Sequence, residues 1–234
     1  MMRLDAYVRI DGSNRRLRAR LNAAPYTTVD LTDGLYAPID LVAHIQTKLQ
    51  VVDAAWTATM GATAVVTLAA PGKTLYIEWT HPALRDLLGW TADISGVASP
   101  SVAPSACAAC FVPTLPWLDR RPLGFLLETS RTDSVRKRGR SYLRTMVRQW
   151  AVTARVKASE AARFRSVMTT LQRGSRARFY RHVDLLSTPW AFSDPHGYVD
   201  VSLNPETRDY SERWLAGGGA QLVYTVDLEF LGVP

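Results

Sequence analysis

The stretch LVYTVDLEF at residues 222–230 alternates apolar and polar side chains from end to end. Successive side chains of an extended chain point to opposite faces, so one face carries Leu222, Tyr224, Val226, Leu228 and Phe230. A strand of this regularity has to bury its apolar face against other elements. The stretch therefore predicts a strand inside a sheet, and its partners are expected upstream.

The residues between 146 and 183 supply those partners. Alternating patterns cover residues 146–157 and 177–183. Between them Phe164, Val167 and Leu171 recur at helical spacing, with Ser159 as the expected N-cap and Gly174 as the expected stop. The residues from 119 to 234 are therefore predicted to form an antiparallel β module with one helix at about 159–173.

The N-terminal part of the chain predicts a second module of strands and helices. Alternation over residues 4–10 and 15–21, with turn residues between them, predicts a β-hairpin. Residues 38–50 place their apolar side chains on one helical face, and residues 56–59, 64–68 and 75–79 predict an antiparallel meander. His81 and Pro82 are expected to open a short helix that Gly89 caps.

Residues 98–118 are rich in Ala, Ser and Pro and follow neither period, which predicts a linker or long loop. The expected organisation is an N-terminal β/α module at 1–97, this linker at 98–118 and the C-terminal module at 119–234. The predicted fold class is α+β, mainly β, with antiparallel sheets or β-sandwich-like modules and one amphipathic helix packed on each.

The composition favours a soluble globular protein. Of the 234 residues, 47% are hydrophobic and 21% are charged, which is enough apolar material for a packed core. No stretch approaches the roughly 20 unbroken apolar residues of a membrane-spanning helix. The opening residues MMRLD also lack the apolar region of a secretory signal. A membrane partner and export are therefore not expected.

The net charge of +7 is carried mainly by arginine, since only four of the 28 basic residues are lysine. Guanidinium groups bind phosphates, but they also bind carboxylates and carbonyls at protein interfaces. Arg16, Arg18 and Arg20 alternate with apolar residues, so they are expected to share one face of a strand. That pattern predicts a wet or intersubunit sheet face.

Residues 120–181 are the most basic region, and their densest run holds Arg136, Lys137, Arg138 and Arg140. No aromatic side chains interleave with this run to stack bases. An exposed loop that meets solvent or an acidic neighbouring subunit is therefore favoured, and nucleic acid is kept as an alternative partner.

Three of the seven tryptophans lie in loop-like surroundings beside proline or arginine: Trp117, Trp190 and Trp214. Large amphipathic rings in such places are typical of protein–protein contacts. Arg120 and Arg121 follow Trp117 closely and complete the interface candidates. The tryptophans indicate an interface rather than an active site.

The sequence gives little support for catalysis. Cys107 and Cys110 have the spacing of a redox dithiol or half a zinc site, but they lie in an Ala/Pro stretch without a second ligand pair, so inert thiols are favoured over a local disulfide and a metal site. Asp194, His196 and Asp200 could orient a base or hold a metal, yet their dipeptides are ordinary turn formers.

Of the remaining histidines, His44 is expected on the flank of its helix, in a position more consistent with solvent than with catalysis, and His81 is expected in a turn. None of the standard hydrolase, metalloprotease or nucleotide-binding motifs occurs. The prediction is a non-enzymatic protein with no catalytic residue, no cofactor, no metal and no small-molecule substrate.

Two parts of the chain resemble structural proteins of tailed-phage virions. The order Gly34-Leu35-Tyr36, a helix over residues 39–49 and short strands ending in LLGW at 87–90 is similar to a module of such proteins. The C-terminal pattern, from Trp150 through the helix to the strand at 224–230, looks like the sheet-plus-helix core of distal tail and tail-tube proteins.

The resemblance implies a ring-forming subunit at the tail tip or baseplate, made in the host cytoplasm and located in the virion tail. Its implied partners are other copies of itself in a homo-oligomeric ring and other virion tail proteins. The alternative function is a basic nucleic-acid-binding or head–tail connector protein that uses the arginine-rich residues 120–181.

Overall fold

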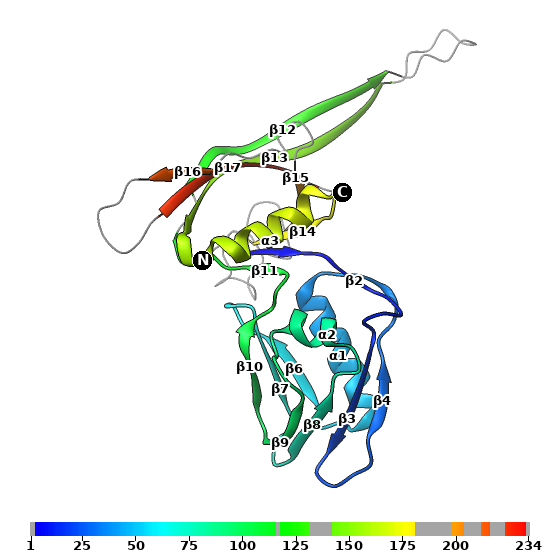
Figure 1. The fold of residues 1–234 in the computed structure, drawn as a ribbon. Helices are drawn as coiled ribbons and strands as arrows, with labels where there is room; N and C mark the ends of the chain where they lie inside the picture. The colour runs from blue at the N-terminus through cyan, green and yellow to red at the C-terminus, as the bar shows by residue number, and fades with distance from the viewer. Residues whose placement is uncertain are drawn as a thin grey trace, which may run out of the picture.

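The chain is described by a computed structural model that covers residues 3–115, 118–131, 142–180, 198–203, 212–215 and 223–232. Its buried apolar residues gather in two main cores, one in each half of the chain. Figure 1 shows the two modules stacked end to end, joined where β1 runs into β2 and where β10 runs into β11. The fold is α+β and mainly β, as predicted, and all the strand pairs among the described residues are antiparallel.

The N-terminal module holds three small sheets and two helices. The larger sheet has the order β4 (Thr27–Asp30), β3 (Arg16–Leu21), β8 (Thr74–Glu78), β9 (Ile94–Ala98). The second has the order β10 (Ser101–Ala106), β7 (Val65–Ala69), β6 (Thr57–Met60), and β2 (Val8–Ile10) pairs with β5 (Gly34–Tyr36). The helices are α1 (Pro38–Val52) and α2 (Pro82–Leu88).

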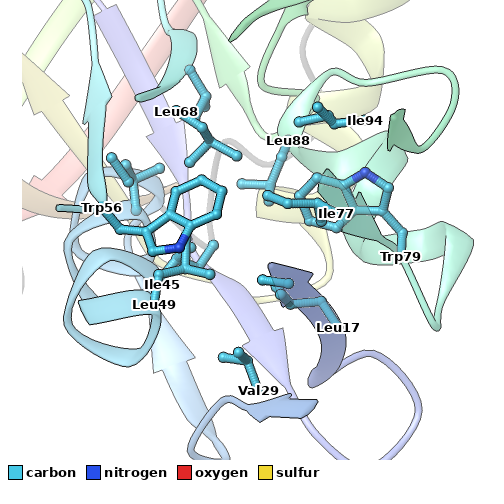
Figure 2. Packing of buried hydrophobic residues seen from close by; sticks show 14 of the residues in the cluster. Leu17, Val29, Ile45, Leu49, Trp56, Leu68, Ile77, Trp79, Leu88 and Ile94 are labelled. Atoms are coloured by element: carbon cyan, nitrogen blue, oxygen red, sulfur yellow. The ribbon is translucent and has the colours of Figure 1, made fainter. Parts of the chain in front are cut away.

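Helix α1 forms because its apolar residues recur at three- and four-residue spacing and its first turn suits a helix start. Pro38 lies at the beginning, where no intrahelical N–H is needed, and Asp40 lies near the positive end of the helix dipole. Leu41, Ile45 and Leu49 are buried against the rest of the core. Figure 2 shows Ile45 and Leu49 beside the Trp56 ring, with Leu68, Ile77 and Leu88 completing the packing from the sheets and α2.

Helix α2 ends at Gly89, as predicted, because the chain there has to adopt a left-handed conformation. Gly89 has φ 93°, and its N–H donates to the carbonyls of the preceding turn at Arg85 and Asp86. A Cβ built at this position would lie 2.1 Å from the carbonyl oxygen of Ser105. Glycine is therefore required both by the backbone conformation and by the close approach of β10.

In the residues that the structure describes, the C-terminal module is an eight-stranded sheet packed against the helix α3. The sheet order is β11 (Cys110–Phe111), β1 (Arg3–Ala6), β14 (Ala177–Tyr180), β15 (Val199–Leu203), β17 (Val223–Gly232), β13 (Tyr142–Lys157), β12 (Leu118–Arg131), and β16 (Glu212–Leu215) also pairs with β17. A 3-10 turn at Ala158–Glu160 leads into α3 (Ala161–Gln172), which buries Phe164, Val167 and Leu171 against the sheet.

The expected hairpin over residues 4–21 is wrong. β1 pairs with β11 and β14, β2 pairs with β5, and β3 pairs with β4 and β8. Alternation of charged and apolar residues usually indicates a strand with one solvent-facing side, but Arg3, Leu4, Asp5 and Ala6 are all buried. Arg3 and Asp5 neutralise each other by an ion pair, so the strand is buried on both faces in the distant C-terminal sheet.

The expected linker at 98–118 is also corrected. Strands β10 and β11 occupy much of it, and β12 begins at Leu118. β10 is an edge strand, which is why it tolerates Pro104. The module boundary at residue 97 moves accordingly, since β10 belongs to the N-terminal module, whereas β1 and β11 belong to the C-terminal sheet.

Two smaller expectations were wrong. The meander is only half right, because β6 and β7 pair but β8 joins β3 and β9 instead of β7. Ser159 does not cap α3: it lies inside the 3-10 turn, where the Glu160 carboxylate accepts a hydrogen bond from the Lys157 N–H. Gly174 follows the helix with φ 89°, consistent with its expected role as the stop.

Candidate interaction surfaces and the module junction

The outer face of the β4-β3-β8-β9 sheet carries the predicted arginine row. Arg16 and Arg18 are exposed and Arg20 is half-buried, while Leu17, Ala19 and Leu21 point into the core, as the alternation predicted. This face is therefore correctly identified as wet, and whether a subunit covers it stays a prediction.

The charges of this row are balanced within the sheet. Arg16 pairs with Asp30 on β4 at 2.9 Å, and Arg18 pairs with Glu78 on β8 at 2.8 Å. Exposed ion pairs of this kind contribute only about 0–1 kcal/mol, so they can be exchanged for contacts with another protein. Because the guanidinium groups of Arg16 and Arg18 already pair with carboxylates, this face is not favoured as a binding site for the phosphates of a nucleic acid.

Arg20 is held between two tyrosine rings. Its guanidinium carbon lies 4.1 Å from the ring centre of Tyr76 and 4.5 Å from that of Tyr26. Cation–π contacts stabilise a guanidinium without requiring an acidic partner. The arrangement gives this end of the face a rigid Arg–Tyr surface.

The β12–β13 hairpin extends beyond the sheet as a two-stranded ribbon. β17 follows β13 only as far as the pair Gln149 and Leu231, whereas β12 continues beside β13 for seven further register pairs, to Arg131 and Tyr142. At about 3.3 Å per residue, this free part is roughly 20 Å long. Figure 1 shows it projecting away from both modules.

The backbone register of the ribbon pairs Phe125 with Arg148, Leu127 with Met146, Thr129 with Arg144 and Arg131 with Tyr142. The sequence of these two strands therefore combines apolar residues with arginine and tyrosine, and aromatic residues and arginine are enriched at protein–protein interfaces.

The remaining interface candidates divide into those the structure describes and those outside it. Trp117, Arg136, Lys137, Arg138, Arg140 and Trp190 lie outside the described residues. Arg120 and Arg121 lie in β12, where the pairing with β13 shifts register. Trp214 was expected in a loop, but it lies in β16 opposite Tyr224.

The candidate catalytic group is not assembled in the part of the chain that the structure describes. Asp194 and His196 lie outside that part. Asp200 accepts a hydrogen bond from the Tyr7 hydroxyl at 2.9 Å and lies 3.4 Å from the Arg178 Nε. Burial and this hydrogen bond raise the pKa of Tyr7. Asp200 is thereby tied into a contact between the modules.

Arg178 is the centre of that contact. It lies on β14 of the C-terminal sheet, and its guanidinium donates to the carboxylate of Asp40, at the start of α1 in the N-terminal module, at 2.7–2.9 Å. The ring of Tyr198 lies 4.2 Å from the guanidinium carbon. One largely buried arginine therefore joins the first turn of α1 to two strands of the other module.

A second arginine closes the junction from β1. Arg3 and Asp5 are fully buried and form two hydrogen bonds of 2.6 Å, while Arg3 also donates to the Gly61 carbonyl at 3.1 Å. Its Nη2 lies 2.7 Å from the Met60 sulfur, and its guanidinium lies over the Tyr180 ring. Burial alone would lower the pKa of Arg3, but the hydrogen bonds and charge of Asp5 outweigh it and raise that pKa.

Cys107 and Cys110 lie beside this cluster as buried free thiols. The turn that carries them is anchored on both sides: the Cys107 N–H donates to the Ala64 carbonyl in the N-terminal module, and the Ala6 N–H of β1 donates to the Ala109 carbonyl. Arg163 of α3 donates to the carbonyls of Ala106 and Cys107.

The site around Cys107 and Cys110 is unsuited to a metal ion. The Arg3 guanidinium lies 3.8 Å from the Cys110 sulfur, so a cation already occupies the space that a metal would share. Among the described residues, no group of three or more His, Cys, Asp or Glu side chains is placed to hold a metal. The same part of the chain contains no helix long and apolar enough to cross a membrane.

The histidines that the structure describes have structural contacts. His44 accepts a hydrogen bond from the Thr32 N–H at 3.1 Å and stacks on Tyr36. Its side chain is therefore held by protein contacts, whereas the sequence predicted a solvent-facing position. Burial and the charge of Lys48 lower the pKa of His44. His81 lies immediately before α2, as the turn prediction placed it.

The junction residues were missed by sequence reasoning, because Arg178 and Asp40 are 138 positions apart and nothing local connects them. A signal did exist for Arg3 and Asp5, since opposite charges two residues apart on an otherwise apolar strand can bury together. Comparisons with models of known protein families, with curated proteins and with solved structures found no match to this chain.

Proposed function

We propose that this chain is a non-enzymatic structural subunit of a phage tail or tail-like machine, which assembles with other copies into a ring at the tail tip or baseplate. The observation that carries the proposal is the two-stranded ribbon of β12 and β13, whose outer part pairs with no third strand among the described residues. A two-stranded ribbon is at best marginally stable alone in water, so its outer part gains stability by packing on another surface.

The distribution of charge supports contacts between unlike surfaces of neighbouring copies. Residues 1–115 hold nine basic and nine acidic residues, residues 120–181 hold seventeen basic and three acidic ones, and residues 182–234 hold two basic and eight acidic ones. A head-to-tail contact joins two different surfaces, and repeated contacts of that kind close into rings when the rotation allows. The ribbon residues 125–131 and 142–148 hold three basic residues and one acidic residue, so an acidic surface on a neighbouring copy would suit them.

The joined modules also suit a scaffold. Arg3, Arg178 and Arg163 each bridge elements that are distant in the sequence. A ribbon on a rigid body loses less conformational freedom when it binds than a ribbon on a loose one. The junction is therefore consistent with an assembling subunit.

The proposal is tested by shortening the ribbon. In one variant, residues 126–147 are replaced by Asn-Gly, which joins Phe125 to Arg148 through a tight turn and leaves the β13–β17 pairing in place. We expect the full chain to form rings at high concentration and the variant to stay a folded monomer. Sedimentation velocity and negative-stain microscopy measure the outcome, and circular dichroism checks the fold.

The matched control for this experiment is Arg16→Ala/Arg18→Ala, which removes two exposed arginines from the other candidate face and leaves the ribbon intact. A full chain that stays monomeric at high concentration, or rings that survive removal of the ribbon, would contradict the proposal. If only the control variant fails to form rings, the contact between copies is made by the β3 face and not by the ribbon.

The alternative function, a nucleic-acid-binding or head–tail connector protein, is favoured by the same excess of seventeen basic over three acidic residues at 120–181. It predicts that affinity for duplex DNA falls steeply with salt, with a logarithmic slope near the number of phosphates neutralised. An affinity that does not change with salt removes this alternative.

A further inference from the structure

The geometry of the Cys107–Cys110 turn brings two thiols into reach of each other. The Cys110 N–H donates to the Cys107 carbonyl at 3.1 Å, which closes a β-turn over four residues. The ends of a β-turn lie within about 7 Å between Cα atoms, and disulfides span about 4.4–6.8 Å. The turn therefore brings the two Cα atoms close to the separation that a disulfide spans.

The turn also couples the two thiols. Interaction with Cys110 lowers the pKa of Cys107, and the Ala109 N–H lowers it further. Burial raises the pKa of Cys110 well above its usual range. Cys107 is thus the better nucleophile of the pair, and Cys110 remains a protonated thiol until the mixed disulfide has formed.

We propose that Cys107 and Cys110 are a reversible modification site that converts between a dithiol and an intramolecular disulfide, with a small disulfide such as oxidised glutathione as the oxidant. The Cys107 thiolate attacks one sulfur of the oxidant, forms a mixed disulfide and releases one glutathione thiolate. Cys110 loses its proton and attacks the Cys107 sulfur, which releases the second glutathione. The protein loses two electrons and two protons, and the oxidant is reduced to two thiols.

The disulfide would stiffen a turn at the joint between the modules. The turn is hydrogen-bonded to Ala64 of the N-terminal module and to β1 of the C-terminal sheet, so fixing its conformation should slow the opening of both contacts. For a tail subunit, which is made in a reducing cytoplasm and released with the particle, oxidation would follow release. This last point rests on the proposed function, whereas the chemistry of the pair does not.

Access to the pair is limited. Cys107 and Cys110 are each 1% exposed, so the oxidant reaches them only when the turn opens locally. Exchange in the folded protein is therefore expected to be slow, and to become faster in guanidinium concentrations too low to unfold the chain.

The experiment equilibrates the purified full chain in glutathione buffers of rising oxidised fraction, with and without that low guanidinium concentration. Acid quenching, thiol alkylation and intact-protein mass spectrometry then count the thiols. We expect complete conversion to a monomer lighter by two hydrogen atoms, at an oxidised fraction at least tenfold lower than a peptide of residues 104–113 requires. Amide hydrogen exchange at Ala6 and Cys107 should slow in the oxidised protein.

The control variant Cys110→Ser lacks the resolving thiol, so it should stop at the mixed disulfide or stay reduced. The proposal is overturned if the folded chain keeps both thiols in buffers that oxidise the peptide, if oxidation occurs only after global unfolding, or if the products are disulfide-linked dimers. Each outcome is measured on the isolated chain, so it is independent of whether the chain assembles into rings.

Discussion

Replacing Asp5 by Asn should destabilise the protein more than almost any other single change of one charge. The substitution preserves the shape of the side chain but leaves the Arg3 guanidinium buried without an anionic partner, in a place where both side chains are fully shielded from water. Breaking one partner of such a pair costs about 3–5 kcal/mol. This corresponds to a loss of roughly two to four orders of magnitude in the folding equilibrium constant.

The matched double variant Arg3→Met/Asp5→Leu removes both charges. It therefore separates the cost of an unpaired buried charge from the cost of any substitution at these two positions. Replacing a buried pair by apolar residues is often neutral, and here the main loss is the hydrogen bond from Arg3 to the Gly61 carbonyl. We expect the double variant to lie within about 2 kcal/mol of the natural chain. The exposed pair supplies a second control, because Asp30→Asn removes a partner of Arg16 in water and should cost less than about 1 kcal/mol.

Equilibrium unfolding in guanidinium, followed by far-ultraviolet circular dichroism, measures all three variants. The reasoning is refuted if Asp5→Asn costs less than about 1 kcal/mol, or if the double variant costs as much as the single one. In either case the junction would not depend on a buried charge pair.

Three further predictions concern the N-terminal module and α3. Burial lowers the pKa of His44, so as the pH drops the histidine binds a proton in the unfolded chain before it does so in the folded chain. The free energy of unfolding should therefore decrease as the pH falls below about 6.5. Thermal unfolding of the natural chain and of His44→Gln at several pH values measures this difference. Gly89→Ala should cost clearly more than Gly174→Ala, because both need positive φ but only the first also meets backbone, and urea midpoints compare them. Leu49→Ala should cost about 2–5 kcal/mol by the same measurement, against less than about 0.5 for the exposed Val51→Ala.

Where one face of an element is buried, its pattern could be predicted from the sequence. The alternation at 222–230 became β17, and the helical spacing at 38–50 became α1. The pattern failed for β1, because an internal ion pair let both faces be buried. It failed for β10 because Ala, Ser and Pro favour strands weakly, and the edge pairing with β7 that forms this strand is not a local property.

For the candidate surfaces too, local features could be predicted from the sequence, whereas contacts between distant residues could not. The shared face of Arg16, Arg18 and Arg20 follows from the two-residue period of a strand. Their partners do not, because Glu78 is 60 residues from Arg18 and is brought there by the order of the sheet. The extent of the ribbon was equally invisible, since it depends on where β17 stops.

The position of β1 has a consequence for the order of events during synthesis on the ribosome. Residues 8–106 contain every strand and helix of the N-terminal module, so that unit can fold as soon as they emerge. The four residues Arg3–Ala6 leave the ribosome before the N-terminal module, yet their neighbour β14 at Ala177–Tyr180 is made about 170 residues later, some 10–35 s at ordinary translation rates. During that interval β1 has no β14 to pair with, so this edge of the strand is completed only after most of the C-terminal half has been made.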